Sequence, residues 1–223
     1  MNLAELAWPQ LERPQLLAVP VGATEQHGPH LPCTVDTDIA VALCDRLARE
    51  REVVVAPPVA YGSSGEHAAF PGTLSIGQQA VRLLLTELGR SADAFAGVVL
   101  VSCHGGNAAP VRAAVRALRA EGRRVLAWSP SGPPDDSHAG RVETAVMLAL
   151  RPEAVRFERA EAGSTVPLPE LIDDLRAGGV GAVSPNGVLG DPRGATAEAG
   201  RRALAEWTNS LLAAVDREFG PKS

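Results

Sequence analysis

The sequence is short of the features that define several protein classes. It has only three cysteines, too few for the disulfide framework of a small secreted domain, which favours a reducing compartment. No apolar run reaches the roughly 18 residues that a membrane-spanning helix needs. The first 15 residues include acidic side chains and no long apolar core, so they do not resemble a secretory signal. We therefore expect a cytoplasmic protein with no membrane partner.

Basic charge is also scarce. The chain has 21 Lys and Arg against 26 Asp and Glu, and its formal net charge is −5. A nucleic-acid-binding domain usually carries a basic patch, so we expect no nucleic-acid partner. The sequence also has no Cys-x-x-Cys, no Gly-x-Ser-x-Gly, no Gly-x-Gly-x-x-Gly and no Walker A motif. These absences argue against thiol redox, serine hydrolase and nucleotide-binding sites.

Apolar sequence is plentiful, in alternating short and long segments. Hydrophobic residues make up 45% of the chain, enough for a packed core in a single domain spanning residues 1–223. Short apolar runs that end near glycine or proline predict strands, and apolar residues at four-residue spacing predict helices. The predicted strands are 16–23, 52–62, 97–107 and 124–130, and the predicted helices are 35–50, 75–92, 108–122, 138–152 and 195–217. This alternation predicts a layered α/β fold with a largely parallel sheet, in which only 160–193 is irregular.

The chemically unusual side chains gather in the loops that follow the predicted strands. The segment GATEQHGPHLPCTVDTD, residues 22–38, holds one Glu, two His and two Asp, although the whole chain has five His. Three further segments, YGSSGEHAAFPGT, CHGGN and DDSHAGRVE, follow the next three strands. Loops at the carboxyl ends of parallel strands meet at one edge of the sheet and bind ligands there. We therefore expect the four segments to converge.

These loops contain the ligand types of a metal site. Glu25 and His27 are two residues apart, so in an extended segment both side chains point to one face. Asp36 begins a predicted helix, where it either caps the helix or reaches back toward that pair. His104 ends a buried strand before two glycines, and it is either a ligand or a core histidine. Mixed His and carboxylate ligands suit Zn²⁺, Mn²⁺ or Fe²⁺, and one Asp can bridge paired ions about 3.5–4 Å apart.

The motifs together resemble a known family. VGATEQHGPHLP followed by VDTD, then GEHAAFPGT, CHGGN and HAGRVETAVML, stand in the order and spacing of the creatininase family of metal-dependent amidohydrolases. The resemblance runs from about residue 17 to about residue 205. It implies a three-layer α/β/α fold with a mostly parallel sheet, and a homo-oligomer. It also implies two divalent ions as cofactors, Fe²⁺ or Zn²⁺ or both, with Mn²⁺ as the alternative.

The resemblance further implies which residues hold the ions. Glu25, Asp36 and His104 match the ligands of one ion. His27 and Asp36 match the ligands of the second, with Asp36 as the bridge. Glu143 matches a family glutamate near the site and is a further candidate ligand.

A second set of residues is expected to act on the substrate. His138 matches the histidine that handles protons in the family, and His67 is the alternative proton donor to a leaving amine. Glu66 is expected to shape the substrate channel. Arg141 and Arg193 are candidates for holding a terminal carboxylate, because the planar guanidinium matches a carboxylate bidentately. Arg141 is preferred, since it lies three residues after His138 and would share a helix face with it.

The chain departs from creatininase itself in two motifs. Gly106 stands where creatininase has a metal-binding glutamate, and PPDDSH replaces a stretch in which creatininase carries a tryptophan. The segments YGSSGEH, ELGRSA and AVSPNGVLGDP instead resemble the branch of the family that belongs to the mycofactocin system. Peptidases of that branch remove a C-terminal Val-Tyr dipeptide from a modified precursor peptide. The resemblance therefore implies a dinuclear-metal peptidase whose partner is such a peptide.

Two other functions fit parts of the pattern. One is a family amidohydrolase acting on a small amide, such as a formamidopyrimidine deformylase or a creatinine amidohydrolase. The other is a metal-binding scaffold without catalysis, which would keep the ligands but would not need His138.

Overall fold

A four-stranded parallel sheet forms the centre of the molecule. The computed structural model describes residues 1–11 and 15–220, so residues 12–14 of the N-terminal stretch lie outside it, as do residues 221–223. The strands are β1 (Leu16–Val21), β2 (Val53–Val55), β3 (Gly97–Ser102) and β4 (Val125–Trp128). Their order is β2-β1-β3-β4, and every neighbouring pair is parallel. The predicted α/β fold is confirmed.

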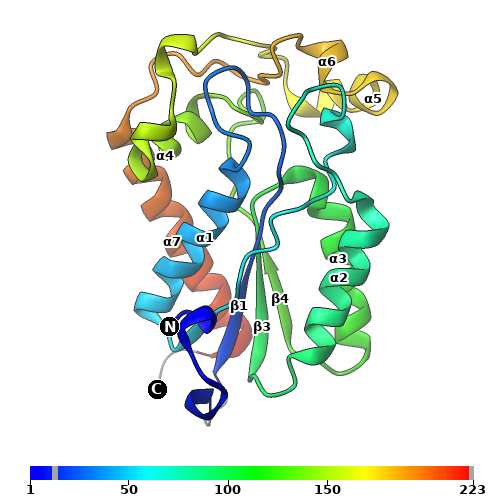
Figure 1. Cartoon of the computed structure of the whole chain (residues 1–223), viewed down its shortest axis with the longest axis vertical. Helices are drawn as coiled ribbons and strands as arrows, with labels where there is room; N and C mark the ends of the chain where they lie inside the picture. The colour runs from blue at the N-terminus through cyan, green and yellow to red at the C-terminus, as the bar shows by residue number, and fades with distance from the viewer. Residues whose placement is uncertain (12–14, 221–223) are drawn as a thin grey trace.

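Helices cover both faces of the sheet and complete three layers (Figure 1). One face is covered by α1 (Val35–Glu50), α4 (Arg141–Leu150) and α7 (Ala197–Phe219), and the other by α2 (Gly77–Ser91) and α3 (Ala108–Ala120). The alternation of side chains along β1 separates the two cores, because Ala18 packs toward the first face and Leu17 and Val19 toward the second. The described residues also form six short 3₁₀ helices: Leu3–Glu5, Trp8–Leu11, Gly65–His67, Gly105–Asn107, Pro152–Ala154 and Phe157–Arg159.

The apolar spacing of α1 builds the larger core. Ile39, Leu43 and Leu47 recur every four residues, lie on one helical face and are buried. They pack in one cluster with Leu204 and Leu211 of α7. Burying one such side chain contributes about 1.5–3 kcal/mol. This packing holds α1 firmly, and α1 carries Asp36 in its first turn.

The expectation that residues 160–193 are irregular is wrong. They contain α5 (Leu168–Gly178) and the short α6 (Val180–Val183), which pack with Phe70 in a small cluster beside the loop that follows β2. Proline and glycine hid this helix, because Pro169 stands in its first turn and Gly179 follows its last residue, and both residue types are also typical of loops. Proline is tolerated in the first turn of a helix, where its missing N–H would have no intrahelical partner.

The carboxyl ends of the four strands lie at the edge of the sheet where α5 and α6 sit, and the chain termini lie toward the opposite end (Figure 1). The strands are shorter than predicted at this edge. β2 ends at Val55, shortly before Pro57 and Pro58, which have no N–H for a ladder, and β3 ends at Ser102. The freed residues form loops over the edge. No helix in the described ranges is long and apolar enough to cross a membrane.

Candidate metal centre

All five histidines are buried, and four of them meet at the carboxyl edge of the sheet. The exception is His30, whose Nε2 lies 2.8 Å from the Thr144 hydroxyl instead. The other four come from the loops after β1, β2, β3 and β4, so the predicted convergence of these loops is confirmed. They surround a group of carboxylates. The four that meet are His27, His67, His104 and His138.

Glu25 and His27 point to one place, as their spacing predicts, and Asp36 meets them there. One ligand atom from each lies within 4.8 Å of the others. Glu25 and His27 are 0% exposed and Asp36 is 2% exposed. His27 donates from Nδ1 to the Glu25 backbone carbonyl at 3.1 Å, which directs Nε2 toward Asp36 Oδ1 at 3.4 Å. Fixing the tautomer through the second nitrogen is typical of metal-binding histidines.

Asp36 does not cap its helix. The N-cap residue of α1 is Thr34, and Asp36 lies inside the first turn. Its Oδ1 faces His27 and its Oδ2 lies 3.5 Å from His104 Nδ1, so the carboxylate stands between two imidazoles. Of the two roles that the sequence left open, the reach toward the Glu25–His27 pair is the one observed.

His104 is also more than a core histidine. Its Nε2 donates to the Ser63 carbonyl at 2.9 Å and lies 3.2 Å from Glu25 Oε2. Its ring therefore joins Glu25 to Asp36, and it reaches this position because β3 ends just before it.

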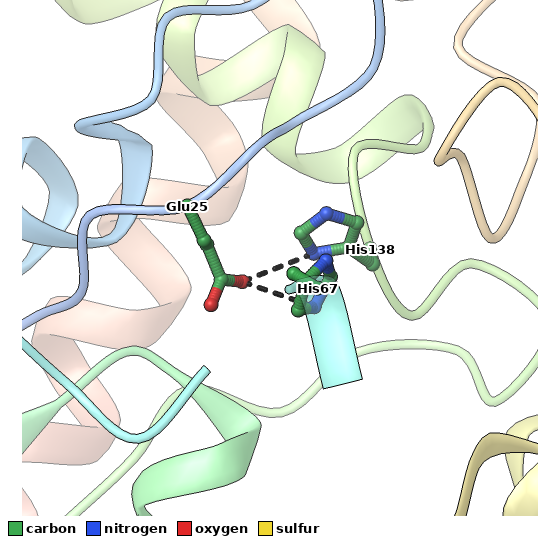
Figure 2. A group of neighbouring side chains, drawn as sticks. All are labelled: Glu25, His67 and His138. Atoms are coloured by element: carbon green, nitrogen blue, oxygen red, sulfur yellow. Dashed lines mark ion pairs between the residues drawn. The ribbon is translucent and has the colours of Figure 1, made fainter. Parts of the chain in front are cut away.

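Two further histidines face the other side of Glu25 (Figure 2). Glu25 Oε1 lies 3.3 Å from His67 Nε2 and 3.6 Å from His138 Nδ1. One ligand atom from each of these three residues lies within 4.8 Å of the others. Both rings contact the side chain of Gln26, a residue that the sequence analysis missed. Its position inside the EQH triplet was the only local signal.

Glu143 approaches the site from the first turn of α4. Its Oε2 lies 3.9 Å from His27 Nε2 and accepts a 2.6 Å hydrogen bond from the Ala139 N–H. Ala139 has φ 53°, the left-handed region that an alanine rarely adopts. The hydrogen bond from Ala139 to Glu143 therefore helps to hold the strained turn that positions His138.

Glu66 is the most solvent-exposed of the carboxylates that face the histidines. Its Oε1 lies 3.7 Å from His104 Nε2, and its side chain is 32% exposed. A Cβ at Gly106 would lie 2.5 Å from this oxygen and would collide with the Ser63 carbonyl and the His104 ring. Glycine at position 106 therefore leaves room for the loop that carries Glu66.

The pKa values at the site are shifted because several carboxylates are buried close together. Burial alone would raise the pKa of Glu25, but His104 outweighs it and the pKa is lowered. Burial raises the pKa of Asp36, and burial also raises that of Glu143 to about 7. Burial would lower the pKa values of His27 and His104, yet Asp36 and Glu25 respectively outweigh it and raise them to about 9 and about 10. The carboxylates thus attract positive charge to this place.

A divalent cation fits this donor set. Both Glu25 oxygens, His27 Nε2 and Asp36 Oδ2 are buried and have no hydrogen-bond partner among the described residues. An unsatisfied buried polar atom costs about 1–3 kcal/mol, and more when it is charged. These unpaired atoms face one another, and mixed nitrogen and oxygen donors suit Zn²⁺, Mn²⁺ or Fe²⁺.

The two arginine candidates lie outside the histidine cluster. Arg193 is exposed and donates from Nε and Nη2 to the two Asp191 oxygens, at 2.9 and 2.8 Å. Arg141 is exposed as well, at the start of α4. No hydrogen bond or ion pair joins either guanidinium to His138 in the described ranges, so a role in holding substrate stays a prediction.

Comparisons with known proteins agree with this geometry. The family model "Creatininase: Creatinine amidohydrolase" matches residues 4–215. A Mycolicibacterium smegmatis protein named "Mycofactocin precursor peptide peptidase" is 49% identical over 210 residues, 91% of this chain and 85% of that protein. A Mycobacterium ulcerans protein of the same name is 48% identical over 94% of this chain and 86% of its own length.

Solved structures show the same fold. A crystal structure of creatinine amidohydrolase superimposes with a TM-score of 0.84 at 26% identity, covering 99% of this chain and 98% of that one. Two further structures are described as "Creatininase Mn" and as a mutant creatininase of "Zn-Zn type". Their TM-scores are 0.83 and 0.82, both at 26% identity, with 99% of this chain covered in each and 99% and 98% of theirs. The chain therefore belongs to the creatininase family, whose metal-dependent hydrolases act on C–N bonds.

Proposed function

We propose that this protein is a dinuclear-metal peptidase that releases the C-terminal Val-Tyr dipeptide from a modified precursor peptide in mycofactocin biosynthesis. The observation that carries the proposal is the set of buried, unpaired ligand atoms on Glu25, His27 and Asp36. It stands in a chain 49% identical to a protein named as a mycofactocin precursor peptide peptidase.

The ligand assignment uses three of the four carboxylates that face the imidazoles and leaves out the exposed Glu66. Glu25, Asp36 and His104 would hold one ion, and His27 and Asp36 would hold the second. Glu143, 3.9 Å from His27, is the further candidate ligand. Two bound ions, Fe²⁺ or Zn²⁺ or both, with Mn²⁺ as the alternative, would lower the pKa of water and polarise the scissile carbonyl.

His138 is the residue that we assign to proton transfer. Its Nε2 donates to the Gln26 carbonyl at 2.8 Å, so its Nδ1 is left as a lone pair toward Glu25. A proton accepted at Nδ1 is then returned to the leaving amine, in the general acid–base role of histidine. Glu66, whose side chain is 32% exposed, lies on the solvent side of the cluster, and we assign it to the channel through which the peptide enters.

A peptidase that counts two residues from the chain end needs a cation for the terminal carboxylate. Arg193 is already paired with Asp191, whereas no described hydrogen bond occupies the Arg141 guanidinium. Arg141 therefore remains the better candidate for this clamp. We place the protein in the cytoplasm, in line with the free thiols of Cys33, Cys44 and Cys103, and as a homo-oligomer, on the family resemblance.

The test is turnover of a defined peptide. Metal-loaded protein is incubated with the modified precursor peptide ending in Val-Tyr, and mass spectrometry follows the free dipeptide. We expect release of Val-Tyr, none with chelated protein, and slower cleavage of the C-terminal amide. Hydrolysis of creatinine or a formamidopyrimidine without peptide cleavage would point to a small-amide hydrolase. No turnover of any of these by protein with bound metal would favour the scaffold.

A further inference from the structure

Gln26 has an unusually complete set of hydrogen bonds for a residue beside a catalytic cluster. Its side chain lies between Glu25 and His27 in the sequence and is 6% exposed. Its Oε1 accepts the Gly28 N–H at 2.8 Å, and its Nε2 donates to the Gly187 carbonyl at 2.9 Å. A backbone N–H only donates and a backbone carbonyl only accepts, so these two contacts fix which end of the amide is oxygen and which is nitrogen.

The second amide hydrogen decides the tautomer of His67. Gln26 Nε2 also lies 2.9 Å from His67 Nδ1 and 3.1 Å from His138 Nε2, and one amide hydrogen remains for the two. His138 Nε2 lies 2.8 Å from the Gln26 backbone carbonyl, which only accepts, so this nitrogen carries a proton and cannot accept the amide hydrogen. The amide hydrogen therefore goes to His67 Nδ1, which must be an acceptor. The proton of the ring therefore sits on Nε2, 3.3 Å from Glu25 Oε1 (Figure 2). An imidazolium would set an Nδ1–H against the amide N–H, so the same contact disfavours the charged ring.

The backbone of Gln26 decides the tautomer of His138 in the opposite sense. The Gln26 carbonyl lies 2.8 Å from His138 Nε2, which must carry the proton because a carbonyl only accepts. His138 Nδ1 is then a lone pair, 3.6 Å from the same Glu25 oxygen. One residue thus turns an N–H of one ring and a lone pair of the other toward Glu25.

We propose that Gln26 is a positioning residue that divides the two histidines between two roles. His138 keeps a lone pair toward the reacting centre and exchanges a proton there, and His67 remains a neutral N–H donor throughout the reaction. The proposal rests on the hydrolase function proposed above. Losing its only ring proton would turn neutral His67 into an anion, so His67 acts as neither acid nor metal ligand. Its Nε2–H faces Glu25 Oε1 at 3.3 Å, as an electrostatic contact and not as a formed hydrogen bond, and it offsets part of the charge of that buried carboxylate.

One further observation agrees with this division. Gly187 has φ 80°, and a Cβ there would collide with the Gln26 amide. The turn that presents the Gly187 carbonyl therefore accommodates the amide only with glycine at this position.

Side-chain swaps separate an N–H donor from a proton carrier. A glutamine amide donates a hydrogen bond but does not transfer its proton, so His67→Gln is expected to keep turnover within about 10-fold of wild type. His67→Ala is expected to lose roughly 10²–10³-fold, as when an oxyanion-hole donor is removed. At position 138 the Gln and Ala variants should be equally slow, by about 10²–10⁴-fold. Equal loss in His67→Gln and His67→Ala, with metal content unchanged, would overturn the donor role.

Nuclear magnetic resonance of the ring nitrogens tests the tautomers directly, without any substrate, and so independently of the proposed function. In the zinc-loaded protein labelled with ¹⁵N-histidine, we expect His67 protonated at Nε2 only and His138 at Nε2 only. Gln26→Glu should move the His67 proton to Nδ1 or add a second, because a carboxylate accepts. Gln26→Met, of similar size and without a donor, should remove the preference, while zinc content stays at the wild-type level. Zinc on His67 Nε2, or a proton on Nδ1 in the wild-type protein, would overturn the proposal.

Discussion

The two ends of the sheet treat charge in opposite ways. At the amino end, Arg51 donates two hydrogen bonds to Asp216, at 2.8 and 2.7 Å, and Arg90 pairs with Glu121, with all four side chains in contact with solvent. At the carboxyl end, Glu25 and its neighbours are buried, and their oxygens lack partners among the described residues.

The two ends differ in how their charged side chains affect the stability of the fold. Exposed pairs contribute about 0–1 kcal/mol each, because water and salt compete with them. Crowded buried carboxylates are unfavourable without a compensating charge, and only the surrounding packing keeps them together. A group of charges held where it destabilises the protein on its own is evidence for a ligand.

The largest effect of a single substitution is expected at Asp36, in the buried cluster. Asp36→Asn keeps the shape of the side chain but removes the charge between His27 and His104, so we expect loss of metal binding and of activity. Asp38→Asn is the matched control, since Asp38 stands in the same helical turn and pairs with Arg151 at 2.8 Å on the surface. Elemental analysis and turnover are measured for both. Full metal content and activity in Asp36→Asn would contradict the assignment.

Removing the metal should show how much the buried carboxylates at the carboxyl end of the sheet destabilise the protein. If the ions compensate the buried carboxylates, zinc at about 100 times its dissociation constant stabilises the protein by about 2.7 kcal/mol. We expect chelation to lower the melting temperature of the wild type, and added zinc to restore it. In Asp36→Asn the same additions should leave the melting temperature unchanged. A wild-type protein equally stable with and without metal would contradict this expectation.

Gly106 tests how closely the loops pack around the site. A methyl group there collides with the Ser63 carbonyl and crowds Glu66, so Gly106→Ala should cost about 1–3 kcal/mol of stability and weaken metal binding. Gly105→Ala is the control, because a Cβ at that glycine meets nothing within 4 Å. Thermal unfolding is followed for both variants. Equal melting temperatures would show that the loop yields without cost.

The smallest effect is expected at the amino end. Arg51→Ala should cost about 0–1 kcal/mol and leave metal content and turnover unchanged. The pair with Arg51 lowers the pKa of Asp216, so its contribution is present above the ordinary aspartate pKa and is lost as the pH falls through the lowered value. Denaturant unfolding at neutral and acidic pH measures both points. A loss of metal in this variant would mean that the two ends are coupled.

Local sequence was enough to predict much of the fold and the chemistry. The spacing of apolar residues and the positions of glycine and proline located the strands and the main helices, because each of them buries a clear apolar face. The spacing of Glu25 and His27 placed both on one face, and the parallel topology predicted that the loops of His67, His104 and His138 would meet them. These inferences needed only neighbouring residues and the direction of the strands.

What the sequence by itself determined, then, was the ligand chemistry, the order of the elements and the edge at which they converge. Only the tertiary structure decided that Asp36 turns toward His27 and His104, that α5 packs beside the loop after β2, and that Glu66 lies against Gly106. It alone joined Gln26 to Gly187, which is 161 residues away. Spacing along the chain sets which way a side chain faces within its own element. The partner of a hydrogen bond or ion pair is set by which distant backbone arrives within about 3 Å, and that depends on how all the layers pack.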